Sequence, residues 1–128
     1  MIKSINPDTI PPPPSNFVHA VEVPAGARTL YISGQTGVNA DGSIPDSTAE
    51  QADIAWQNLI EILIAADMGV ENIVKVTVLV TDAADNAIAR EKRTQYAGDY
   101  KGTSTFMVVA GLANPKLKFE IEAIAAKV

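Results

Sequence analysis

Two carboxylates stand in the last apolar segment of the chain, where a buried strand would ordinarily carry hydrophobic residues. The segment 117–127 reads as a β-strand, but Glu120 and Glu122 interrupt it. Successive side chains of a strand point to opposite faces, so the two carboxylates share one face, while Phe119 and Ile121 share the other. A carboxylate that is removed from water needs a partner, or its pKa rises into a range suited to proton transfer. The pattern leaves two readings open: structural ion pairing across a subunit interface, or a small-molecule cleft.

Few other side chains offer chemistry. His19 is the only histidine, and it shares strand parity with Phe17 in the segment 16–23. An imidazole there is either a structural group or a proton shuttle. Arg90 and Arg93 lie on a predicted helix, either as a solvated face or as cations that face a site. One histidine and scattered carboxylates lack the spacing of metal ligands, and no Gly-rich phosphate loop occurs, so we expect neither metal nor organic cofactor.

The composition narrows the class of protein. A chain of 128 residues fits one domain, and its formal charge of −5 argues against a nucleic-acid partner. The absence of cysteine excludes disulfides, thiolate catalysis and Cys-ligated zinc. No apolar run is long enough for a membrane span or a signal peptide, so we expect a soluble, cytoplasmic protein without a membrane partner.

The apolar pattern predicts a single α+β domain with the element order ββαβαββ. The predicted strands are 16–23, 28–33, 73–81, 104–112 and 117–127, and the predicted helices are 48–68 and 84–97. Ser47 and Glu50 form a capping box at the start of the first helix, and Gly69 is a natural residue to end it. The segment 24–27 has the length of a hairpin loop, so the first two strands are expected to form a hairpin.

The N-terminal residues and the sheet surface give two further expectations. Residues 1–15 have no periodic pattern and include the prolines 11–14, so they are predicted to be an extended, Pro-rich lead-in to a domain at 16–128. Two helices can cover only one face of the sheet. Because the strand 104–112 is apolar at both parities, its other face needs a cover that this chain lacks. We therefore expect a homo-oligomer in which sheets pack on sheets.

Three segments in register resemble the Rid proteins (the RidA/YjgF family): YISGQTGV at 31–38, KVTVLVTD at 75–82 and LKFEIEAIA at 117–125. The resemblance covers nearly the whole chain, from Phe17 to Ala126. It implies a chorismate-mutase-like fold and a homotrimer with a central β-barrel and three inter-subunit clefts. It also implies hydrolysis of enamines and imines such as 2-aminoacrylate to a 2-keto acid and ammonia, without a cofactor. Other members, named L-PSP, are described as ribonucleases or translation inhibitors.

The same resemblance assigns roles to individual residues. Glu120 matches the glutamate that positions the attacking water. Gly34, with Ser33, matches the loop whose backbone faces the cleft. Phe17 matches an aromatic residue that is usually tyrosine, so its hydroxyl is missing here. Ser104 falls where the deaminating members carry an arginine that binds the substrate carboxylate.

The change from arginine to Ser104 bears on the substrate. A guanidinium fork holds a carboxylate bidentately, whereas a hydroxyl offers one neutral hydrogen bond. A small 2-imino acid then needs another cation, for which Arg90 and Arg93 are the candidates. The predicted catalytic residue is Glu120, and the predicted substrate-binding residues are Phe17, His19, Ser33, Gly34, Arg90, Ser104 and Phe106.

Three functions follow from these observations. The favoured one is a cofactor-independent deaminase or related hydrolase that acts on an imine or enamine other than 2-aminoacrylate, with Glu120 positioning water. The second is a non-catalytic trimer that binds a metabolite or partner in the same cleft. The third is a ribonuclease or translation inhibitor, against which the acidic charge argues because phosphate contacts dominate nucleic-acid affinity.

Overall fold

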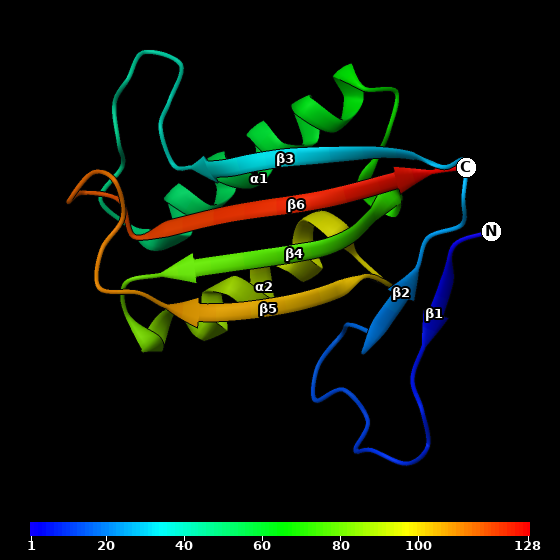
Figure 1. Ribbon diagram of the computed structural model, residues 1–128. Helices are drawn as coiled ribbons and strands as arrows, with labels where there is room; N and C mark the ends of the chain where they lie inside the picture. The colour runs from blue at the N-terminus through cyan, green and yellow to red at the C-terminus, as the bar shows by residue number, and fades with distance from the viewer.

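A four-stranded mixed sheet organises the chain, with the strand order β3-β6-β4-β5 (Figure 1). The strands are β3 (Arg28–Thr36), β4 (Ile73–Val80), β5 (Thr103–Val108) and β6 (Phe119–Lys127). β6 is antiparallel to both β3 and β4, while β4 and β5 run parallel. The computed structural model describes all residues from 1 to 128. The last strand of the sequence therefore lies inside the sheet, where it contacts two neighbours.

Two helices lie behind this sheet, α1 (Thr48–Ala65) and α2 (Asn86–Ala97), and both cover the same face (Figure 1). Short 3₁₀ turns at Val70–Asn72 and Ala83–Asp85 precede β4 and α2. This arrangement confirms the predicted fold class, a single α+β domain with a mixed sheet and two helices on one face. Neither helix combines the length and the hydropathy that a membrane span requires.

The core lies between the helices and the sheet and follows the strand alternation. On β4 and β6, Val78 pairs in register with Ile121, and Val80 with Phe119, and all four side chains are buried. The helical stripe of α1 packs on them through residues with no exposed surface: Ala52, Ala55, Trp56, Leu59 and Leu63. The predicted apolar face of the last strand is confirmed as the face toward the helices.

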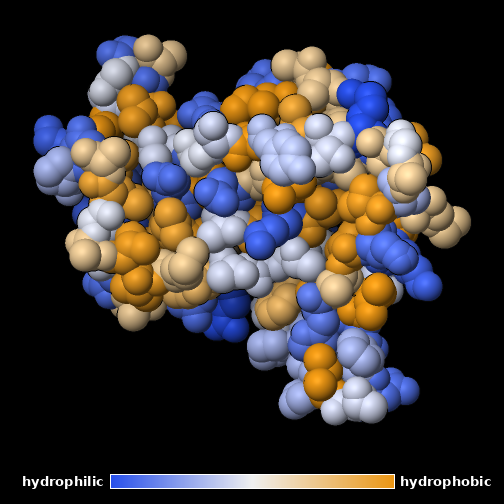
Figure 2. All heavy atoms as spheres, viewed as in Figure 1, coloured by the Kyte–Doolittle hydropathy of each residue, from blue (hydrophilic) through white to orange (hydrophobic).

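The opposite face of the sheet has no covering layer in this chain. Glu122 is exposed on it and Glu120 is half-buried, while Tyr31 and Met107 are 76 % and 44 % exposed. Figure 2, drawn from this side, shows hydrophilic and hydrophobic side chains mixed across the surface. The sheet face is thus uncovered, as expected, but subunit association stays a prediction.

The predicted hairpin between the first two strands is wrong. β2 (Ala20–Glu22) is only three residues long and pairs with β1 (Lys3–Ile5), a strand that the sequence pattern did not indicate. β3 pairs instead with β6. Since β6 matches the nine-residue length of β3, it provides a much longer ladder than β2 offers. The division of the chain at residues 15 and 16 stays a prediction.

The first helix also ends earlier than the expected Gly69. It stops at residue 65, and Asp67 adopts the left-handed conformation (φ 57°) that the sequence suggested for the glycine. Two cations bind the free carbonyls at this end: Arg28 Nη1 donates to Ala66 O at 3.2 Å and Lys127 Nζ to Asp67 O at 2.7 Å. Helix C-termini favour such cations because their last carbonyls lack intrahelical partners.

Candidate functional site

Glu120 lies beside a bulge on the uncovered face of the sheet. The register between β3 and β6 shifts between Ile32 and Gln35, so that Ser33 and Gly34 together oppose one residue of β6. The Glu120 side chain fills the space where a Cβ on Gly34 would stand. No hydrogen bond or ion pair within the chain occupies its carboxylate, which leaves both oxygens free for a water or a ligand.

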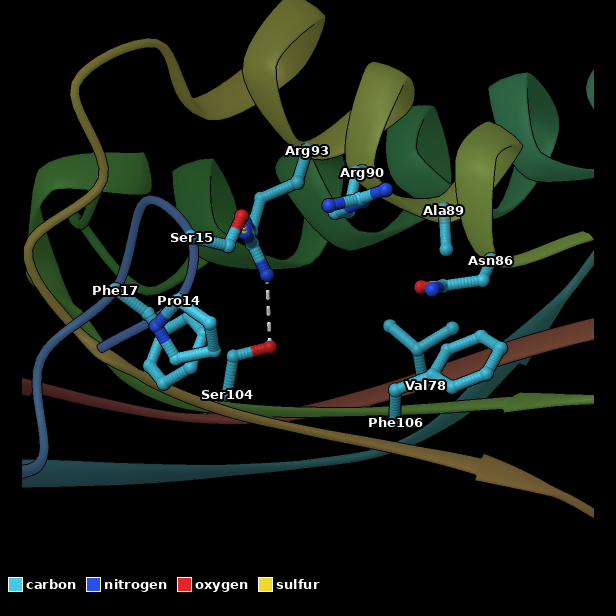
Figure 3. Close-up of a pocket in the computed structure, with 10 residues that line it drawn as sticks. All are labelled: Pro14, Ser15, Phe17, Val78, Asn86, Ala89, Arg90, Arg93, Ser104 and Phe106. Atoms are coloured by element: carbon cyan, nitrogen blue, oxygen red, sulfur yellow. Dashed lines mark hydrogen bonds between the residues drawn. The ribbon is translucent and has the colours of Figure 1, made fainter. Parts of the chain in front are cut away.

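A second group of predicted residues surrounds a cavity of about 330 Å³ on the helix side, between α2 and β5 (Figure 3). The lining residues are Pro14, Ser15, Phe17, Val78, Asn86, Ala89, Arg90, Arg93, Ser104 and Phe106. Ser104 and Phe106 point from β5 toward α2, while Phe17 and Ser15 close the cavity from the N-terminal segment (Figure 3). The structure thus brings together Phe17, Arg90, Ser104 and Phe106, all of which the sequence nominated.

Arg93 is the cation that reaches Ser104. Its Nη1 donates to Ser104 Oγ at 2.9 Å and its Nη2 to Ser15 Oγ at 3.1 Å. The guanidinium lies 5.7 Å from the ring centre of Phe17 and 5.9 Å from that of Tyr100. Burial lowers the pKa of Arg93 and raises that of Tyr100. Arg93 of α2 therefore contacts Ser104, the residue that the resemblance aligns with the arginine of the deaminating members.

Within one chain, Glu120 and Ser104 cannot share a ligand. Ser104 pairs with Val76, and Val76 with Ala123, which lies three residues from Glu120. Three residues is an odd number, so Glu120 points to the face opposite Ser104. Two strand spacings and three residue steps also separate their backbones by roughly 14 Å. The sequence-predicted site is thus split into two groups of residues.

His19 lies neither at the bulge beside Glu120 nor in the wall of the 330 Å³ cavity. It is exposed, and it lines a shallow groove in which Phe17 and Ser104 also lie. Its Nε2 donates to Pro11 O at 2.7 Å, because a carbonyl oxygen can only accept. This hydrogen bond ties the histidine to the proline segment, and its role toward a substrate stays a prediction. No group of three or more His, Asp or Glu side chains is placed to hold a metal ion.

A polar cluster fixes α2, and with it both arginines, against α1. Asp53 of α1 accepts from Lys92 Nζ and from Tyr96 Oη, each at 2.8 Å. Tyr96 also stacks on Trp56, with ring centres 5.9 Å apart. Partial desolvation opposes ionisation of Asp53, but the hydrogen bonds from Lys92 and Tyr96 outweigh it, so its pKa is lowered. The hydrogen bond to Asp53 raises the pKa of Lys92.

Replacing Asp53 with Asn is expected to lower the free energy of unfolding by about 1–2 kcal/mol near neutral pH, since water screens this one-third exposed carboxylate. The pKa of Asp53 is lower in the folded than in the unfolded chain. Its contribution is therefore complete above the unfolded value of about 3.9 and is lost as the pH falls through the folded value. Urea titrations from roughly pH 3 to pH 8 should show the two proteins converging in acid. Asp99→Asn, which breaks an exposed pair with Lys101, is the control and should change nothing measurable. A difference that persists undiminished in acid would contradict the assignment.

Comparison with known proteins agrees with the fold and the strand motifs. The sequence model of the Endoribonuclease L-PSP family matches residues 8–127, so the chain belongs to this family, also known as the YjgF/Rid family. The 2-iminobutanoate/2-iminopropanoate deaminase of Rattus norvegicus is 38 % identical over 104 residues, which cover 78 % of this chain and 74 % of that protein. The putative reactive intermediate deaminase TdcF of Escherichia coli K12 is 35 % identical over 77 % of this chain and 78 % of that protein.

Solved structures of similar proteins share this fold over nearly the whole chain. The Rid-family protein YyfB of Yersinia pestis superposes with a TM-score of 0.87 and 34 % identity, covering 98 % of both chains. The structure of Escherichia coli TdcF with bound serine superposes with a TM-score of 0.69 and 30 % identity, covering 98 % of this chain and 99 % of that one. The relatives named in both comparisons include imine and reactive-intermediate deaminases, which supports a deaminase-type activity at the level of the family.

Sequence reasoning left parts of the cavity unassigned. Ser15 and Asn86 carry no motif. Of the two candidate cations, the sequence analysis placed Arg90 among the substrate-binding residues, whereas the arginine that contacts Ser104 is Arg93. The helical spacing of Arg90 and Arg93, three residues apart, was the available signal that both face the same neighbour. The depth of each side chain was not available from spacing: Arg93 is buried against β5, whereas Arg90 is exposed.

Proposed function

We propose that the protein is a cofactor-independent deaminase that hydrolyses a 2-imino acid, or the enamine in equilibrium with it, to the 2-keto acid and ammonia. The observation that carries this proposal is the unpaired carboxylate of Glu120 beside the exposed backbone of Gly34. The imine deaminases among the relatives support the reaction class. The serine bound in TdcF supports a ligand with the size and carboxylate of a small amino acid.

In the proposed reaction, Glu120 accepts a proton from a water molecule while the oxygen attacks the imine carbon. The bond between carbon and oxygen forms, and the C=N double bond becomes a single bond as its nitrogen takes up a proton from solvent, which the hydroxyl of the adduct returns in the last step. Glu120 then returns its proton to the amino group of this tetrahedral adduct. The C–N bond breaks, ammonia leaves, and the adduct's hydroxyl loses its proton to give the keto group, so one water is consumed for each ammonia released.

The two groups of residues complete one site when subunits associate. We propose that a homotrimer packs its uncovered sheet faces in a central barrel, as the resemblance implies. Each cleft then combines the arginine-lined cavity of one subunit with Glu120 of its neighbour. The opposite charges of Arg93 and Glu120 support this pairing, since one binds a substrate carboxylate while the other activates water. The mixed polar and apolar character of the uncovered face is compatible with such packing (Figure 2).

The test is ammonia release from a panel of freshly generated 2-imino acids, with Gly34→Ala as the diagnostic variant. A Cβ at residue 34 collides with the flexible end of Glu120, so the carboxylate must move while the fold remains. A displacement of about 1 Å costs roughly a hundredfold in rate, and we expect kcat to fall by about ten- to a hundredfold.

Gly111→Ala is the matched control, because a Cβ there meets open space and should leave the rate unchanged. If the wild-type protein fails to accelerate ammonia release from every member of the panel, the proposed activity is wrong. Equal rates in wild type and Gly34→Ala would remove Glu120 from the mechanism.

A further inference from the structure

Arg93 is a buried cation without a counter-ion. Its residue exposure is 8 %, and the only ion pairs in the chain join other residues. Its two hydrogen-bond partners, Ser104 and Ser15, are neutral hydroxyls, and its buried Nε has no partner at all. Buried charges in proteins are ordinarily paired, because removal from water disfavours a lone charge. An unpaired guanidinium at this depth therefore indicates a missing anion.

The surroundings stabilise the positive charge but do not neutralise it. The rings of Phe17 and Tyr100 flank the guanidinium at distances typical of cation–π contacts. The Tyr100 hydroxyl donates to Thr103 O at 2.7 Å, and burial raises its pKa, so it stays protonated beside the arginine. Arginine itself remains charged in proteins. The cavity thus keeps a full positive charge at its inner end.

The cavity in front of Arg93 has the composition of a carboxylate site. None of its lining residues is acidic, and a second cation, Arg90, stands with Asn86 on the exposed side (Figure 3). Its floor is apolar, formed by Val78 and Phe106. A phosphate or sulfate would interact with the two arginines but has no apolar group to contact Val78 and Phe106. A carboxylate attached to an apolar body matches both the charged end and the floor.

We propose that Arg93 binds the carboxylate of the substrate, whose apolar side chain lies along Val78 and Phe106 toward the exposed side of the cavity. The guanidinium N–H donors that Ser104 and Ser15 leave free form the carboxylate-binding fork. The two serines position this fork by accepting its other donors. The inference rests on the proposed function for the identity of the ligand as a 2-imino or 2-keto acid, but it concerns binding alone.

The experiment measures binding of 2-oxo-4-methylpentanoate, a 2-keto acid with an apolar side chain, by calorimetry near neutral pH. The corresponding amide, 2-oxo-4-methylpentanamide, has nearly the same shape without the charge. We expect the acid to bind wild type at least about tenfold more tightly than the amide, the difference between charge-assisted and neutral hydrogen bonding. Equal binding of acid and amide would overturn the proposal without any variant.

Three variants locate the effect. Arg93→Met should weaken binding of the acid at least about tenfold and leave binding of the amide unchanged. Arg93→Lys keeps the charge but loses the fork, so its affinity for the acid should lie between those of wild type and Arg93→Met. Arg28→Met removes the same charge from an exposed residue of β3 and should bind like wild type. A Tm of Arg93→Met at or above the wild-type value is expected, since an unpaired buried charge gives way to an apolar group. Undiminished acid binding by Arg93→Met would overturn the proposal.

Binding and turnover separate this inference from the proposed function. Tight, Arg93-dependent binding of the keto acid by a protein that releases no ammonia would leave the inference standing and reject the deaminase. Ammonia release with the same KM in wild type and Arg93→Met would keep the deaminase and reject Arg93 as the carboxylate-binding residue.

Discussion

The Glu120→Gln variant should release ammonia from 2-imino acids about 10²- to 10⁴-fold more slowly than the wild-type protein, the range that general acid–base catalysis contributes. The amide has nearly the same size as the carboxylate but cannot take a proton from water at neutral pH. Because Glu120 makes no hydrogen bond or ion pair in the chain, the exchange leaves no group unpaired. We therefore expect the loss in kcat, with KM and Tm close to those of wild type.

Glu122→Gln is the control for this experiment. Glu122 stands on the same strand and the same face and is exposed, so the variant makes the same chemical change with the same effect on net charge. It should retain the wild-type rate. If the two variants lose activity equally, the effect comes from the charge of the sheet face or from subunit packing, and the assignment of Glu120 as the base fails.

The Gln51→Leu variant should lose about 3–5 kcal/mol of unfolding free energy, because each buried polar group left without a partner costs about 1–3 kcal/mol. The Gln51 side chain has no exposed surface. Its Nε2 donates to Pro45 O and to Lys116 O, both at 2.9 Å, and its Oε1 accepts from Lys118 N at 2.7 Å. One side chain thus joins α1 to the loop before it and to the residues that lead into β6.

Urea denaturation with Gln57→Leu as the matched control measures this effect. Gln57 lies on the same helix and is exposed, so the same substitution there should stay within about 0.5 kcal/mol of wild type. Since β6 begins one residue before Glu120, the surviving folded fraction of Gln51→Leu should also have lower kcat. Equal stability of the two variants would show that the backbone groups near Gln51 find other partners.

The strand pattern alone placed the carboxylates correctly. Alternation has a period of two, so the faces of Glu120 and Phe119 follow from their positions as soon as the segment is extended. The same argument gave the buried face of β4, and helical spacing gave the stripe of α1 that contains Trp56. The Ser47 half of the predicted capping box is confirmed: Ser47 Oγ accepts from Glu50 N at 3.1 Å, and α1 begins at the next residue, Thr48. The Glu50 carboxylate accepts from the Ser47 hydroxyl, at 3.1 Å, rather than from the Ser47 backbone amide. These features depend only on neighbours in the sequence.

Strand partners and side-chain depth were decided by the tertiary structure. β2 pairs with β1 rather than with β3, because β6 offers β3 a longer ladder, and no local signal reports such competition. The pairing of Arg93 with Ser104 likewise depends on how closely α2 packs on β5, a distance that residue spacing in the sequence does not report.

The sequence by itself therefore determined the family, the two helices on one sheet face and the exposure of the carboxylate face. Only the fold decided which helix arginine meets Ser104: Arg93 of α2 donates a hydrogen bond to its hydroxyl. The reason is physical: residue spacing fixes the direction of a side chain, whereas its partner depends on distances across the whole packed domain.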